Sequence, residues 1–182
     1  MEIVALILGL LAVALFLLCY QFKKRIHIVL CNIASRVFYI LQYIFLFAFE
    51  GAAMDIAAIL SSVFAARKNK GFVAKHKKLI FICLKIIIVV VGLLLYKNIF
   101  SLFSIIGVLF ETVALWLDNE KHIRILSLLG APFWLIYNVV CGAFGSAIGN
   151  ALSIISIITA MFRHDIKFKK KETNSDTPPE EN

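Results

Sequence analysis

The sequence predicts an all-α polytopic membrane protein, and three observations lead to this prediction. The chain of 182 residues is 62% hydrophobic and only 16% charged. It contains several apolar runs of the roughly 20 residues that a membrane-spanning helix needs. Most of its 19 basic residues gather between alternate runs. A water-soluble domain of this length could not bury so much apolar surface, so the bilayer is the expected solvent.

The apolar runs define seven expected transmembrane helices. The first run is followed by Lys23, Lys24 and Arg25, whereas a cleaved secretory signal has its positive charge ahead of the apolar core, so we expect a retained helix. Glu50 and Gly51 are expected to form a tight reversal between the second and third spans. Residues 169–182 lack apolar side chains and are expected to be a disordered cytoplasmic tail after a single domain, 1–168. The expected spans are 3–20, 28–49, 52–66, 79–96, a fifth that ends near Leu117, and two in the hairpin 125–162.

The distribution of basic residues predicts the orientation of these helices. Loops after the first, third, fifth and seventh spans hold 16 of the 19 Lys and Arg residues, and the other loops hold only Lys97. Cytoplasmic loops are enriched in Lys and Arg. We therefore expect the N-terminus outside and the C-terminus in the cytoplasm, and we attribute the net charge of +8 to topology rather than to nucleic-acid binding.

An odd fourth helix between two groups of three predicts two parallel three-helix repeats joined by a linker helix. Repeat one would cover 1–70, the linker helix 79–96 and repeat two 98–165. At an offset of 95 residues, Tyr39 aligns with Trp134 and Asp55 with Asn150, so an aromatic residue and an Asp or Asn recur 16 residues apart in both halves. The third and seventh spans carry ridges of small residues, which predicts that they lie at the centre of each bundle.

This plan resembles the sugar-transporting SWEET and PQ-loop families, in which matching residues line a central site. The resemblance implies that role for Tyr39, Asp55, Trp134 and Asn150. The second half is also similar to the YgjV family of bacterial inner-membrane proteins, through IIGVLFETVALW, PFWLIYNVVCGAFGSAI and the closing MFR. The sequence departs from the SWEET pattern because it has no PQ dipeptide and no proline in the first, second or fifth helix.

Polar and aromatic side chains within the spans predict an amphipathic pocket between the repeats. Aromatic faces could stack on a sugar-like or flat solute, while amides and a carboxylate orient it. The alternative is that these groups only bond one another across helices and hold the bundle together. The candidate substrate-binding residues are Tyr39, Gln42, Asp55, Trp134, Tyr137, Asn138 and Asn150.

Two further ionisable residues, Arg36 and Glu111, are expected at comparable depth from the cytoplasmic side. Each would be costly alone in the bilayer, so we expect an intramembrane charge pair or a protonated Glu111. Such a pair could be a structural staple or take part in transport. Lys85 is expected to extend its ammonium toward the cytoplasmic surface.

Three classes of function follow from these features. A small-solute transporter with a central site between the repeats is the first, and a non-transporting membrane scaffold or accessory protein is the second. An intramembrane enzyme is not expected, because the chain holds no HExxH, GxSxG or glycine-rich phosphate loop. The four cysteines have no metal-binding spacing, so we expect no metal and no cofactor. The expected partners are the lipid bilayer and a small polar solute, and the sequence predicts no oligomeric state.

Overall fold

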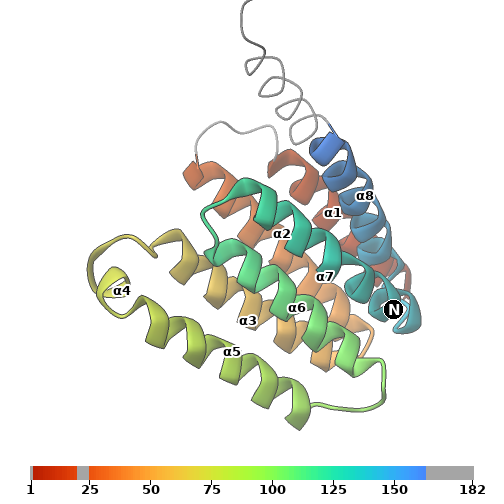
Figure 1. The fold of residues 1–182 in the computed structure, drawn as a ribbon. Helices are drawn as coiled ribbons and strands as arrows, with labels where there is room; N and C mark the ends of the chain where they lie inside the picture. Colours follow the sequence, from red (N-terminus) through yellow and green to blue (C-terminus); the bar gives the residue numbers. More distant parts are fainter. Residues whose placement is uncertain (1, 20–24, 163–182) are drawn as a thin grey trace, which may run out of the picture.

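The computed structural model describes residues 2–19 and 25–162, and the secondary structure of these residues is helical (Figure 1). The expected loop at 20–24 and the expected tail at 169–182 lie outside the described residues. Seven helices correspond to the expected spans, and the short α4 lies within the expected linker between the third and fourth spans. The helices are α1 (Glu2–Cys19), α2 (Arg25–Phe45), α3 (Phe49–Ala66), α4 (Gly71–Lys75), α5 (Lys77–Leu94), α6 (Ser101–Trp116), α7 (Glu120–Val140) and α8 (Phe144–Met161).

The outer surface of these helices is apolar. Three segments are long and apolar enough to cross a membrane, namely α3, α8 and residues Lys121–Val140 of α7, while α1, α2 and α6 contain shorter apolar stretches. On α5 a stripe of Leu84, Ile88 and Gly92 is buried, and flanking side chains such as Ile86 and Leu93 are more than half exposed. Exposed apolar area on this scale is stable in lipid and unfavourable in water.

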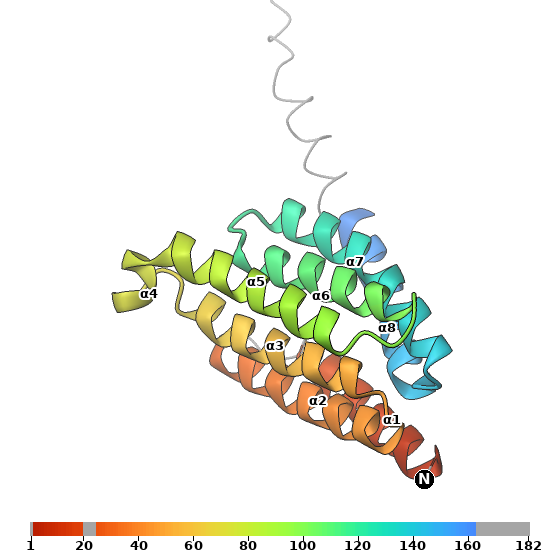
Figure 2. The same ribbon diagram turned by 90° about the horizontal axis from the view of Figure 1, so that it is seen from below.

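Six helices form a closed ring. Around it, α1 packs on α2, α2 on α3, α3 on α6, α6 on α7, α7 on α8, and α8 on α1. Helix α5 lies outside the ring against α3 and α6, and Figure 2 shows α1, α2 and α3 side by side along one edge of the molecule. The prediction that the third and seventh spans are central is wrong. Instead α2 and α7 lie between their neighbours, because the small residues of α3 and α8 serve contacts with the opposite group of helices.

The reversal predicted at Glu50 and Gly51 lies at residues 46–48, and both predicted residues belong to the first turn of α3. Phe47 takes a left-handed conformation with φ 55°, and the Ala48 N–H donates to the Tyr43 carbonyl over 2.9 Å. A non-glycine residue rarely adopts this conformation, so the sequence pointed to the nearby glycine instead.

The turn between α7 and α8 has the same construction. Gly142 has φ 76°, and the Ala143 N–H donates to the Asn138 carbonyl over 2.8 Å. Adding 95 to the residue numbers of the first turn gives those of the second, and adding 95 to the bounds of α2 and α3 gives the bounds of α7 and α8. We refer to the end of the molecule with these turns as the turn end.

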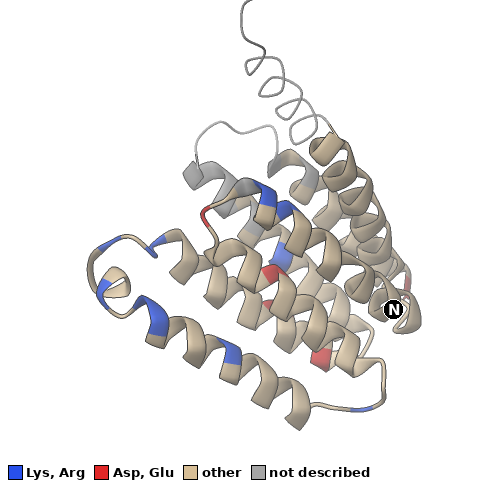
Figure 3. Ribbon diagram, viewed as in Figure 1, with Lys and Arg blue, Asp and Glu red and all other residues tan. Residues whose placement is uncertain are grey.

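The opposite end carries most of the Lys and Arg residues, and we refer to it as the basic end (Figure 3). Lys68, in the linker between α3 and α5, is buried here. Its Nζ donates to the carbonyls of Trp116 at 3.0 Å and Leu117 at 2.7 Å, and it pairs with Asp118 at 2.6 Å. The hydrogen bond from Lys68 holds the pKa of Asp118 below its usual value. Lys68 thereby caps the C-terminal end of α6.

Candidate functional site: a polar cavity inside the helix ring

The ring encloses a cavity of about 440 Å³, within the range of small-molecule sites. All six ring helices line it. We call it the central cavity. From the first half of the chain its polar lining comprises Ser35, Arg36, Tyr39, Tyr43 and Asp55. From the second half the polar and aromatic lining residues are Glu111, Arg124, Ser127, Trp134, Asn138, Ser146, Asn150, Ser153 and Ser156.

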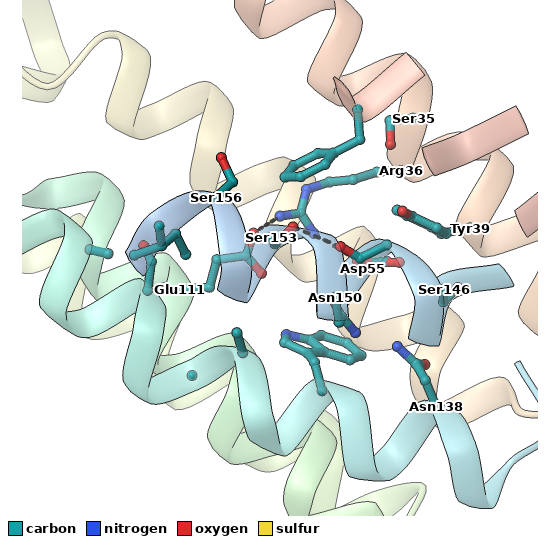
Figure 4. Close-up of a pocket in the computed structure, with 18 of the residues that line it drawn as sticks. Ser35, Arg36, Tyr39, Asp55, Glu111, Asn138, Ser146, Asn150, Ser153 and Ser156 are labelled. Atoms are coloured by element: carbon teal, nitrogen blue, oxygen red, sulfur yellow. Dashed lines mark hydrogen bonds and ion pairs between the residues drawn. The ribbon is translucent and has the colours of Figure 1, made fainter. Parts of the chain in front are cut away.

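Three charged side chains meet in this cavity. Arg36 on α2 donates from Nη1 to Asp55 Oδ1 on α3 over 2.7 Å, and from Nη2 to Glu111 Oε1 on α6. Figure 4 shows the guanidinium between the two carboxylates. The two residues expected to pair, Arg36 and Glu111, are therefore in contact, and Asp55 is a third member. A charge in the bilayer is costly unless paired, so one cation holding two anions stabilises all three.

Among the described residues, two of the lining residues with polar atoms that lack a hydrogen-bond partner are Asn150 and Trp134. The described residues form no hydrogen bond with the Asn150 side chain. Trp134 is 7% exposed, and its Nε1–H is buried and unpaired within the described part of the chain. A buried donor left unpaired costs free energy that a bound solute or water would recover. The half-buried Asn150 amide is available to a ligand, whereas the Trp134 N–H is fully buried beside Gly107 of α6.

The turn end of the cavity is closed by hydrogen bonds between the two halves. Tyr43 donates to Asn138 Oδ1 over 2.6 Å, and adding 95 to the first number gives the second. Ser146 donates to Gln42 Oε1 over 2.5 Å. Tyr43, Asn138 and Ser146 are buried, whereas lining residues near the basic end, such as Ile123 and Ser156, are half-buried or exposed. The cavity is therefore accessible toward the basic end.

Gln42 and Tyr137 do not line the cavity, contrary to the prediction. Successive residues of a helix point about 100° apart, so the neighbours of Tyr43 and Asn138 face the seams between helices. Gln42 lies against Ser146, and Tyr137 packs edge-on against Trp134 with ring centroids 6.0 Å apart. The other predicted residues, Tyr39, Asp55, Trp134, Asn138 and Asn150, do line it.

Several lining residues escaped the sequence prediction. Tyr43 could have been found, because the offset of 95 that relates Tyr39 to Trp134 also relates Tyr43 to Asn138. The hydroxyls on α8 follow helical spacing at Ser146, Ser153 and Ser156 on the face of Asn150.

Lys85 was expected to reach the cytoplasmic surface. Its Nζ donates to Thr112 on α6 and lies 5.0 Å from the Phe81 ring, one turn nearer the basic end.

The apolar exterior and the polar cavity define an all-helical membrane protein with an internal site. The family model of the bacterial inner membrane proteins called Imp-YgjV matches residues 3–167. The chain therefore belongs to this family, as its second half indicated. No curated protein and no solved structure matches the chain.

Proposed function

We propose that the protein is a carrier for a small polar solute, which binds in the central cavity. The observation that carries this proposal is the cavity itself, at the centre of a ring whose two halves both supply polar groups. A purely structural polar core would pair its groups and leave no space. Here the Asn150 amide and the Trp134 N–H remain unpaired among the described residues.

The proposed carrier consists of two parallel three-helix repeats, α1–α3 and α6–α8, with α5 as the linker helix. The shared offset of the helix bounds and the matching turns support this arrangement. The seams between repeats are α3 against α6 and α8 against α1. Motion of one repeat against the other at these seams would open the cavity alternately to each side. All seven long helices would span the inner membrane, with the N-terminus outside and the basic end in the cytoplasm.

The chemistry of the cavity favours an uncharged, sugar-like solute. The charges of Arg36, Asp55 and Glu111 are engaged with one another. The groups left for a ligand are a neutral amide, the hydroxyls of Ser127 and Ser156 and an aromatic surface, which suit hydroxyl groups and a flat apolar ring face. We propose no catalytic step, because a carrier needs only binding and release.

Replacing Asn150 with Ala tests the proposal. Purified protein is screened with neutral sugars and polyols for a rise in melting temperature, since a ligand at about 100 times its Kd stabilises by roughly 2.7 kcal/mol. Asn150→Ala should remove most of this stabilisation and abolish uptake of the same solute into proteoliposomes. Its melting temperature without solute should change little, because the described residues offer this side chain no partner.

Thr159→Ala is the matched control. Thr159 lies on the same helix, is exposed, and donates to the Ile155 carbonyl of its own helix. This variant should keep both the stabilisation and the uptake. If no neutral solute stabilises the wild type, or if Asn150→Ala lowers the melting temperature without affecting solute binding, the polar groups are structural and the scaffold function holds instead.

A further inference from the structure

The charged groups of the cavity are distributed unequally between the two halves. Adding 95 to Arg36 and Asp55 gives Ala131 and Asn150, so the second half has neutral residues where the first has an ion pair. The remaining charge, Glu111, comes from α6 of the second half. The Arg36–Asp55 pair is thus internal to the first repeat, whereas the Arg36–Glu111 pair crosses the seam between the repeats.

The two carboxylates differ in their access to the cavity. The Asp55 side chain is 5% exposed and that of Glu111 is 31% exposed. Each uses one oxygen to accept from Arg36, and within the described residues no donor reaches the second oxygen of either. Glu111 therefore presents an unpartnered oxygen to the cavity, which the half-buried Asn150 amide also lines without a partner among the described residues.

The charged and titratable side chains around Glu111 determine the net charge at this position. The charged or titratable groups that face it are Arg36 and Tyr39 on α2, Asp55 on α3, Lys85 on α5 and Arg124 on α7. Lys85 is engaged by Thr112 on α6, and Arg124 lies nearer the basic end. Among the described residues, α1 and α8 add no titratable group to the lining. At the point of contact, two carboxylates share one guanidinium, an excess of one negative charge.

We propose that Glu111 is the proton-binding site of a proton-coupled carrier. A proton from the basic end adds to the free Glu111 oxygen and converts the carboxylate to a carboxylic acid. The cluster of Arg36, Asp55 and Glu111 then becomes neutral, and Arg36 remains bound to Asp55 within its own repeat. The charge pair that links α2 of one repeat to α6 of the other is lost, so the repeats can separate at the α3–α6 seam. This inference rests on the proposed carrier function, and assigns its coupling ion.

Infrared difference spectroscopy of the protein in lipid bilayers tests the proposal. Acidification of the sample should produce the carbonyl band of a protonated carboxyl group. Glu111→Gln should abolish this band, because its amide can still accept from Arg36 but cannot take up a proton. Glu50→Gln, which removes a buried carboxyl group outside the cavity, is the matched control and should retain the band. If Glu111→Gln does not fold, the Glu50→Gln variant with isotope-labelled glutamate should show the band shifted.

Several outcomes would overturn the proposal. They are a band that persists in Glu111→Gln, a band lost only in Glu50→Gln, a labelled sample with an unshifted band, and a response to sodium ions in place of acid. Solute binding provides a separate readout. In Glu111→Gln, neutral solutes should still raise the melting temperature, while a pH gradient should no longer drive their accumulation. Solute-induced stabilisation without any proton signal would refute proton coupling and leave the carrier function intact.

Discussion

At the scale of single residues, the contact between Tyr43 and Asn138 is the best test of how the turn end is closed. Both side chains are almost fully buried, and the hydrogen bond joins positions related by the offset of 95 residues. Tyr43→Phe keeps the ring, whose centroid lies 6.1 Å from that of Tyr137, but leaves Asn138 Oδ1 without its donor. We expect a loss of about 0.6–1.7 kcal/mol, the range measured for hydrogen bonds between membrane helices.

Reversible unfolding in mixed micelles measures this change. Tyr96→Phe is the control, because Tyr96 is exposed at the end of α5 and should leave the free energy of unfolding unchanged. A double-mutant cycle with Asn138→Leu isolates the pair, since two substitutions that remove one interaction are not additive. Additive losses would show that Tyr43 and Asn138 contribute independently, contrary to the closure described above.

At the scale of helices, the contact between α1 and α8 depends on the close approach of two glycines. A Cβ atom added at Gly145 would lie 2.6 Å from the Gly9 Cα, which is backbone and cannot turn aside. A Cβ atom at Gly149, one turn further along α8, would meet the ends of the Tyr39 and Val13 side chains at 2.7 and 2.8 Å. Such side chains can move more easily than a helix backbone.

Gly145→Ala should therefore destabilise the protein by about 1–3 kcal/mol through separation of α1 from α8. Gly149→Ala on the same helix should cost less. Unfolding curves for the two variants measured side by side give the difference. Equal stability, or a greater loss in Gly149→Ala, would mean that the seam between the repeats does not depend on this glycine contact.

At the scale of the whole molecule, the sequence was sufficient to predict the long helices but not their order around the ring. Apolar runs and basic loops locate spans because the bilayer sets their length and the charges set their ends. Small-residue ridges show that a helix packs closely, but not against which neighbour, so α3 and α8 were wrongly expected at the centre of each bundle.

The sequence also did not show that Asp55 belongs to the charge cluster with Arg36 and Glu111. Arg36 was expected to pair with Glu111 by depth, whereas Asp55 was assigned to the solute because of its match with Asn150. Depth along a helix follows from counting residues, but the direction of a side chain depends on which helices flank it. The ring places α2 between α1 and α3, and this arrangement turns Arg36 toward both acids.

Single cysteines in the cavity can report the side of the membrane to which the cavity opens. In a variant with all four cysteines replaced, a single new cysteine at Ser156 or Ser146 reports access from either side. Ser156 is exposed and Ser146 is 3% exposed behind the Tyr43–Asn138 closure. If the basic end is cytoplasmic, a membrane-impermeant thiol reagent should modify Ser156→Cys in inside-out vesicles but not in intact spheroplasts.

Ser146→Cys should react slowly from both sides, and faster from the outside once Tyr43→Phe removes the closure. Modification of Ser156→Cys only in intact spheroplasts would reverse the orientation. Unchanged reactivity of Ser146→Cys after Tyr43→Phe would show that this hydrogen bond does not close the outer end.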